Sequence, residues 1–244
     1  MILEICANSV ASCIAAQEGG AQRIELCAGI PEGGTTPSYG MVKKAREAVS
    51  IGLNIIIRPR GGDFLYSPTE VEEMIEDIKI LGTLGVDGFV FGALTPDGEV
   101  DKEVCKRLIE AAQGSPVTFH RAFDMAKDPK QALEDIIELG FDRILTSGCM
   151  PSALEGVSTI AMLVREAQDR IAIMAGCGVN ASNVHEIVQM TGVKEVHGSF
   201  RSPIESKMRY RNSVVSMGGT VVVEEYSTPQ TDAEKVKEII NIIG

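Results

Sequence analysis

Two cysteines draw attention because each ends a short apolar run, two residues after a glutamate. Glu4-Ile-Cys6 closes the first run, and Glu25-Leu-Cys27 closes the second. Side chains at positions i and i+2 of a strand share a face, so each cysteine lies on the same face as its glutamate. Soft thiolates select Cu(I), which accepts few ligands, and Cys6 and Cys27 are therefore candidate Cu(I) ligands. The alternative for any free cysteine is a structural role as a small buried side chain.

A second group of residues suits anion binding or acid–base chemistry. Arg58 and Arg60 follow the third apolar run, His120 and Arg121 end the fifth, and His197 ends the last. The sequence is acidic overall, with a formal net charge of −11, so cationic groups at the ends of several runs are informative. Guanidinium groups bind carboxylates and phosphates through paired hydrogen bonds. These five residues are therefore candidates for binding an anionic substrate.

His120 and Glu25 are the candidate catalytic residues if the protein is an enzyme. His120 would be a general acid or base, because imidazole titrates near neutral pH. Glu25 would be an orienting or basic carboxylate. A structural alternative is that Arg58 neutralises Glu4 or Glu25 inside the protein, since ion-pair networks also form in protein interiors.

Glycines after two further runs add to the anion-binding hypothesis. Gly176 and Gly178 flank Cys177, and Gly198 follows His197. Glycines leave room for an anion to approach backbone N–H groups, as in many phosphate sites. The alternative is that they only form tight turns.

The elements that must position these residues follow a regular strand–helix rhythm. Helix-length segments separate eight short runs rich in apolar residues, which we predict to be strands: Ile2–Cys6, Arg23–Cys27, Asn54–Arg58, Gly88–Phe91, Val117–His120, Arg143–Thr146, Ala172–Ala175 and Lys194–His197. This rhythm predicts an α/β protein with a parallel sheet. With 244 residues and eight units, the chain is predicted to form a single (β/α)₈ TIM barrel over residues 1–244. In such a barrel, residues at the carboxyl ends of the strands form the functional site.

Four helix starts carry capping signals. Ser67-Pro-Thr-Glu70 is a full capping box with proline at the first helical position. Asp128–Gln131, Ser152–Glu155 and Thr231–Glu234 repeat the pattern, and Gly140 is a typical helix stop.

The segment Ser199–Gln230 departs from this rhythm, because about thirty residues separate the last strand from the last helix. A structureless connection of that length is uncommon in a compact domain. Val221–Glu225 is predicted to add a short strand, and Val214, Val215 and Met217 are apolar residues available for contact. We therefore expect a homodimer or higher homo-oligomer. A non-catalytic sensor or assembly protein acting through this segment is a third functional class.

Composition excludes several functions. The net charge of −11 argues against binding nucleic acids or anionic membranes, which select positive surfaces. The first residues lack the basic region of a signal peptide, and no run of about 18 apolar residues occurs, so we expect a cytoplasmic protein. Six cysteines without a CxxC pair are expected to be reduced there.

Several motifs resemble those of the CutC copper-homeostasis family, and the resemblance extends over essentially the whole chain. They are Arg23–Cys27, Glu32–Ser38, Arg58–Phe64, Phe91–Leu94, Phe119–Asp124, Leu145–Gly148 and Tyr210–Asn212. The resemblance implies a cytoplasmic (β/α)₈ barrel that binds Cu(I) at the positions of Cys6 and Cys27, in a family named for copper tolerance with no established enzymatic reaction. Cys177 departs from the family pattern, where glycine is more usual.

Two functions therefore compete. The resemblance favours a copper-binding protein, with the copper ion as its ligand. The arginines and His120 favour instead an enzyme that acts on a small phosphate- or carboxylate-bearing metabolite at the barrel mouth. Fold alone cannot separate the two, because barrels host many functions.

Overall fold

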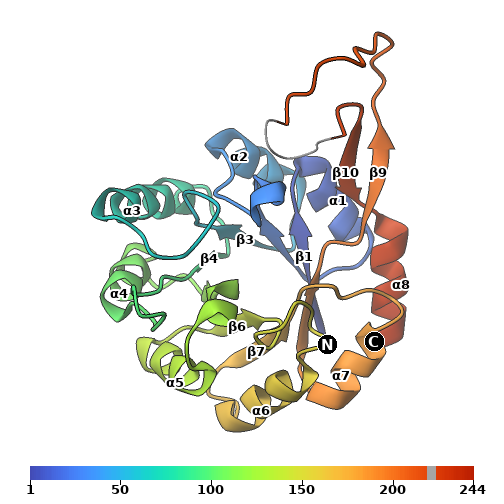
Figure 1. Cartoon of the computed structure of the whole chain (residues 1–244). Helices are drawn as coiled ribbons and strands as arrows, with labels where there is room; N and C mark the ends of the chain where they lie inside the picture. The colour runs from blue at the N-terminus through green and yellow to red at the C-terminus, as the bar shows by residue number, and fades with distance from the viewer. Residues whose placement is uncertain (219–223) are drawn as a thin grey trace.

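Eight parallel strands close into a barrel in chain order, as the sequence predicts. The structure is a computed structural model that describes residues 1–218 and 224–244 (Figure 1). The barrel strands are β1 (Ile2–Ala7), β2 (Arg23–Leu26), β3 (Gly52–Ile56), β4 (Gly88–Phe91), β5 (Val117–Phe119), β6 (Arg143–Thr146), β7 (Ala172–Ala175) and β8 (Glu195–Gly198). The predicted (β/α)₈ fold is confirmed.

Helices surround the barrel, one after most of the strands (Figure 1). They are α1 (Val10–Glu18), α2 (Tyr39–Ala48), α3 (Pro68–Gly82), α4 (Lys102–Ala111), α5 (Pro129–Leu139), α6 (Val157–Ala167), α7 (Val184–Thr191) and α8 (Ala233–Ile243), with short 3₁₀ turns at Ile30–Glu32 and Arg121–Met125. Within the described residues, none of these helices combines the length and the apolar character that a membrane crossing requires.

Two of the four predicted capping signals are placed as expected, and two are not. Ser67 and Glu70 form the reciprocal capping box of α3, and Asp128 caps α5. The hydroxyl of Ser152 does bond Glu155, but these residues form a turn, and α6 begins only at Val157. The N-cap of α8 is Asp232 rather than Thr231. Thr231 is the last residue of a strand, and its N–H donates to the hydroxyl of Ser12.

The main apolar core lies between the strands and the helices, whereas the lumen of the barrel holds charged side chains such as Glu4 and Arg23 together with apolar ones such as Met174. Alternate residues of each strand face the lumen, and strand register brings them into layers. Glu4 of β1 lies beside Arg23 of β2 on one side and His197 of β8 on the other. Cys6 lies beside Glu25 in the next layer toward the carboxyl ends. The predicted site residues on β1, β2 and β8 therefore share one interior.

The long segment after β8 begins and ends as an antiparallel ribbon that projects from the barrel (Figure 1). Its strands are β9 (Arg201–Glu205) and β10 (Ser227–Thr231), with Pro203 opposite Pro229. Asn8 binds the carbonyl of Pro229 at 3.0 Å, which ties β10 to the barrel. The predicted strand at 221–225 falls largely on residues 219–223, which lie outside the described part of the chain.

Candidate functional site

A cavity of about 290 Å³ opens at the carboxyl ends of the barrel strands. Its apolar walls come from Ile56, Phe64, Met125 and Leu145. Its polar lining comes from Cys6, Glu25, Cys27, Glu32, Arg58, His120, Arg121, Asp124 and His197. The structure thus brings both candidate cysteines together with Glu25, Arg58, His120, Arg121 and His197.

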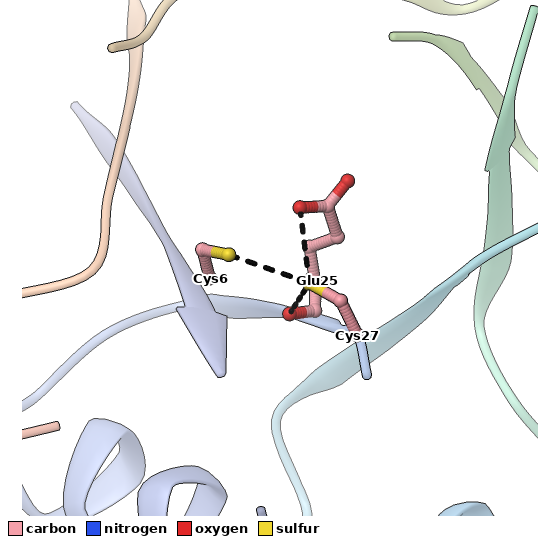
Figure 2. Close-up of side chains that lie close together, drawn as sticks. All are labelled: Cys6, Glu25 and Cys27. Atoms are coloured by element: carbon pink, nitrogen blue, oxygen red, sulfur yellow. Dashed lines mark hydrogen bonds between the residues drawn. The ribbon is translucent and has the colours of Figure 1, made fainter. Parts of the chain in front are cut away.

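Cys6 and Cys27 form a close thiol pair at the ends of adjacent strands. Their Sγ atoms are 3.3 Å apart. The Sγ of Cys27 also lies 3.7 Å from Oε2 of Glu25, and ligand atoms of all three residues lie within 4.8 Å of one another (Figure 2). In the described residues no other group of His, Cys, Asp or Glu meets this criterion for a metal site.

The two thiols differ in charge. The hydrogen bond from Cys27 stabilises the Cys6 thiolate and holds the pKa of Cys6 well below its usual value, despite burial that opposes this shift. The same hydrogen bond and burial raise the pKa of Cys27 well above its usual value. Arg201 adds to the asymmetry, because its guanidinium lies 3.4 Å from Sγ of Cys6. The first proton of the pair is therefore lost more readily from Cys6 than from Cys27.

His197 and Glu25 also have shifted pKa values. Burial disfavours charge on His197, but its hydrogen bonds to Cys6 and Glu4 outweigh burial and hold its pKa well above 6.5. Its Nδ1 lies 2.8 Å from Oε1 of Glu4. Burial raises the pKa of Glu25 to about 8, although His197 lies 3.6 Å away and opposes the shift. The surroundings thus favour the protonated form of both side chains.

The pKa of His120 lies below the near-neutral value expected from the sequence, and its assignment as a general acid or base stays a prediction. Burial and the charge of Arg58 lower the pKa of His120 to about 3. Its Nδ1 accepts a hydrogen bond from the N–H of Ala122 at 3.3 Å, so the ring proton is on Nε2. Among the described residues, Nε2 of His120 has no hydrogen-bond partner.

Arg58 does not neutralise Glu4 or Glu25, contrary to the structural alternative. Its guanidinium instead binds backbone carbonyls of the neighbouring loops, namely those of Glu32 at 2.8 Å, Gly34 at 3.0 Å and Gly62 at 2.8 Å. Its Cζ lies 4.9 Å from the centre of the Phe64 ring. Arg58 therefore fixes two long loops over the cavity. Its Nε is buried and has no partner in the described part of the chain.

Sequence reasoning missed the groups that neutralise the lumen carboxylates. Arg23 binds both Glu4 and Glu195, and Arg143 also binds Glu195, at 2.5 Å. These four side chains form an ion-pair layer below the cysteines, which we call the floor of the lumen. A signal was present, because Arg23 precedes Glu25 by two residues and so shares its inward face.

Arg121 lies at the cavity, but its guanidinium is already paired. It donates to Asp124 at 2.7 Å and to Ser147 at 3.0 Å. Asp124 in turn accepts hydrogen bonds from the hydroxyl of Thr146 and the N–H of Cys149. Asp124 was not singled out as a site residue, yet it ties together the loops after β5 and β6.

Arg60 is not brought to the cavity. Its side chain lies outside, where it donates to Glu70 at 2.5 Å, contacts Asp63 at 3.1 Å and stacks over the ring of Tyr66. The guanidinium of Arg60, which was predicted to bind an anion, is therefore paired with Glu70 of the α3 capping box.

The three predicted anion-binding glycines also lie away from the cavity lining. A Cβ at Gly176 would meet Leu145 at 2.5 Å, and one at Gly198 would meet the ring of Phe200 at 2.4 Å. The carbonyl of Gly178 accepts hydrogen bonds from the side chains of nearby asparagines. These glycines allow close packing and turns, and none of the three lines the cavity.

Comparison with known proteins assigns the chain to a family. The model of the CutC family matches residues 1–202. The chain belongs to the CutC family. A CutC family protein of Parabacteroides distasonis is 57% identical over 240 residues, which cover 98% of this chain and 99% of that protein. The copper homeostasis protein cutC homolog of Homo sapiens is 49% identical over 238 residues, covering 98% of this chain and 87% of the human protein.

Solved structures agree with the CutC assignment and with the fold. A putative copper homeostasis protein CutC from Streptococcus agalactiae is 39% identical, with a TM-score of 0.78 over 82% of this chain and 98% of that one. Thiamine phosphate pyrophosphorylase from Pyrococcus furiosus is only 14% identical, with a TM-score of 0.60 over 99% of this chain and 95% of that one, and shows likeness of fold alone.

Within this CutC-family chain, Cys177 occupies a backbone conformation that favours glycine. Its φ is 78°, in the left-handed region where a Cβ is strained. Its Sγ lies 3.1 Å from the carbonyl of Pro151, in the loop that follows β7, and β8 separates β7 from β1. Cys177 is therefore not part of the thiol pair.

Proposed function

We propose that this CutC-family protein binds Cu(I) through Cys6 and Cys27, in a role in copper homeostasis. The observation that carries the proposal is the 3.3 Å separation of the two Sγ atoms at the end of the lumen. Cu(I) prefers soft sulfur ligands at low coordination number. The pair supplies two such ligands, whereas the third member of the cluster, Glu25, offers only a hard oxygen.

The charges around the pair also suit Cu(I). One ion bound by two thiolates carries a net charge of −1, which burial alone would disfavour. Arg201 and the protonated His197 lie beside Cys6 and offset that charge. Binding of Cu(I) requires both cysteines to lose their protons, and the lowered pKa of Cys6 favours the loss of the first.

The names of relatives support a role in copper handling. The human relative is named as a copper homeostasis protein cutC homolog, and the Streptococcus agalactiae structure as a putative copper homeostasis protein. We extend that role to this chain and place it in the cytoplasm, as the sequence predicts.

The test is an anaerobic Cu(I) titration against a competing chelator. The Cys6→Ser/Cys27→Ser variant should bind Cu(I) more weakly by at least about a hundredfold, because both soft ligands are lost. The matched control is Cys149→Ser/Cys177→Ser, which also removes two half-buried thiols at the barrel mouth and should leave the affinity unchanged. Unchanged affinity in the folded first variant, or equal loss in the control, would refute the assignment.

We also propose that the protein self-associates through the segment after β8. Val214, Val215 and Met217 are exposed there, with 90% of Val214 accessible. Apolar groups at such exposure favour burial in an interface. Sedimentation of a monomer of 26.1 kDa at micromolar concentration would contradict this.

Fewer observations support the alternative function, an enzyme that acts on a small anion. Arg60 and the three glycines lie away from the cavity, and the lowered pKa of His120, about 3, makes its imidazole a weak base. What remains is a pair of donors on the wall of the cavity, at Arg58 and His120.

A further inference from the structure

The two thiols of the pair are close together but differ in exposure. Their Sγ atoms are 3.3 Å apart, and both residues line the cavity of about 290 Å³ at the barrel mouth (Figure 2). Cys6 is half-buried, whereas Cys27 is only 1% exposed. A small reagent that enters the cavity therefore meets Cys6 first, with a second thiol next to it.

The surroundings of the two sulfurs also differ. The guanidinium of Arg201 lies 3.4 Å from Sγ of Cys6 and donates to the carbonyl of the same residue at 3.1 Å. The thiol of Cys27 lies instead 3.7 Å from Oε2 of Glu25. Reactive cysteines in proteins are partly exposed and lie in electropositive surroundings. Cys6 meets both conditions, and Cys27 meets neither.

The backbone holds the two residues in place to form a covalent bond. Cys27 follows the last residue of β2, and its N–H donates to the carbonyl of Ala7 on β1 at 2.9 Å. A disulfide holds its sulfurs at about 2.05 Å, so these two atoms must approach by about 1.2 Å. The backbone hydrogen bond keeps the strand ends side by side, so the gap to be closed lies between the side chains.

The other four cysteines lack this arrangement. Cys13 and Cys105 are fully buried in the core between strands and helices. The thiol of Cys177 donates to the carbonyl of Pro151 rather than to another thiol. In the described part of the chain, Cys6 and Cys27 are the cysteines that line the cavity.

We propose that Cys6 is a site of modification by small peroxides and that Cys27 converts the product into a Cys6–Cys27 disulfide. In the first step the sulfur of Cys6 attacks one oxygen of hydrogen peroxide, the O–O bond breaks, and Cys6 becomes a sulfenic acid as water leaves. In the second step the sulfur of Cys27 attacks the sulfenic sulfur, and an S–S bond replaces the S–O bond. The hydroxyl leaves with the proton of Cys27 as a second water. The two thiols lose two electrons, which the peroxide gains.

The disulfide would regulate the site of the proposed function, and this part of the inference rests on that function. Thiolates bind Cu(I), whereas the sulfurs of a disulfide carry no charge to donate to the metal. Oxidation of the pair should therefore prevent Cu(I) binding, and reduction should restore it. The protein would bind copper only while the pair is reduced.

The test treats the reduced, metal-free protein with an equimolar amount of hydrogen peroxide. The intact mass should fall by about 2 Da, because two thiol hydrogens are lost. Peptide mapping should then find Cys6 linked to Cys27, and a phosphine reductant should reverse the change. The matched control is Cys149→Ser/Cys177→Ser, which keeps the pair and should form the same linkage.

Two single variants separate the roles of the two sulfurs. Cys27→Ser should stop after the first step and accumulate a sulfenic acid at Cys6, which dimedone traps as an adduct. Cys6→Ser should leave Cys27 unmodified, because its sulfur is buried. A dimedone adduct at Cys27 in place of Cys6 would reverse the assigned roles and overturn the proposal.

The wild type alone also decides the matter, even if neither variant folds. The proposal is overturned if peroxide yields no Cys6–Cys27 peptide, or if it oxidises Cys6 to a sulfinic acid without forming the link. These measurements contain no copper, so their outcome is independent of the proposed Cu(I) binding. If the reduced protein binds no Cu(I), the proposed function fails and the disulfide chemistry stands.

A final measurement tests the regulation itself. Cu(I) is titrated into the oxidised and the reduced wild type under the anaerobic conditions described above, with no reductant added to the oxidised sample. The oxidised protein should bind Cu(I) at least about a hundredfold more weakly, as the Cys6→Ser/Cys27→Ser variant does. Equal affinity of the two forms would overturn the regulatory role.

Discussion

The floor and the mouth of the lumen are both buried and both charged, but they differ in how their polar groups are paired. On the floor, Arg23 and Arg143 meet Glu4 and Glu195, so each charge faces an opposite one. At the mouth, Nε2 of His120 and Nε of Arg58 have no partner among the described residues. At the mouth, the pKa of Cys6 is also lowered by its hydrogen bond with Cys27 and by nearby cations.

The difference distinguishes two uses of buried polarity. A closed ion-pair layer contributes to holding the strands in register and leaves nothing for a ligand to bind. Unpaired buried donors destabilise the folded chain unless a ligand satisfies them. Pairing, rather than charge or burial, therefore distinguishes the candidate site from the floor.

The largest effect should follow from breaking the floor. Arg23→Met leaves Glu4 and Glu195 without their shared cation, and removing one partner of a buried ion pair costs about 3–5 kcal/mol. We expect urea denaturation to show that the free energy of unfolding falls by that amount.

The control for this change is Arg170→Met. Arg170 pairs with Glu134 on the surface, where both side chains are about half exposed, so the cost should stay below about 1 kcal/mol. If Arg23→Met were as mild as this control, the floor would not stabilise the barrel.

A smaller effect should separate the mouth from the floor by pH. The pKa of His120 is lowered from 6.5 to about 3, so its stabilising contribution is present above pH 6.5 and is lost as pH falls toward 3. The pKa of Glu4 is lowered from 4.5 to about 2, so the floor loses stability only below pH 4.5. Between pH 6.5 and 4.5 the loss therefore comes from the mouth.

This prediction is checked with His120→Asn, which lacks the titrating ring. The stability advantage of the wild type over the variant should shrink by about 1.4 kcal/mol for each pH unit below 6.5. The difference between the two proteins is the proper quantity, because Glu25 has a raised pKa of about 8 and titrates in the opposite sense. A difference independent of pH would show that His120 is not held neutral by the fold.

The smallest effect concerns backbone strain at the mouth. Cys177→Gly should stabilise the protein by about 1 kcal/mol relative to Cys177→Ala, because the left-handed φ of 78° penalises any Cβ. Both variants lack the sulfur, so the comparison isolates the backbone. Equal melting temperatures would mean that the turn relaxes without cost.

The fold was predictable because its signals are local and repeated. Strand runs such as Arg143–Thr146 and Ala172–Ala175 recur at regular spacing and match β6 and β7. The predicted helix starts were wrong where hydrogen bonds to residues distant in the sequence determine the local structure. Thr231 is a strand residue instead of a helix cap, because Ser12 of a distant helix binds its N–H.

The candidate site was predictable only in part. The two-residue spacing placed Cys6 and Cys27 correctly beside each other, because strand alternation is a local property. The partners of Arg58 and Arg60 could not be predicted, since they are loop carbonyls and a helix-capping carboxylate whose positions depend on loop conformation. The pKa of His120 depends on burial, which no spacing encodes.

The opposed prolines of the ribbon have a consequence for association between molecules. Pro203 and Pro229 face each other at a position where neither strand donates to the other, so their backbone nitrogens face the outer edges. The edge of β10 is bound by Asn8 and Ser12, but that of β9 projects with Pro203 and Glu205 on it. An incoming strand would need a backbone N–H from β9 at each pairing position, and Pro203 has none. The charge of Glu205 also disfavours pairing with another strand at this edge. The ribbon can therefore extend from the barrel without recruiting further strands into an aggregate.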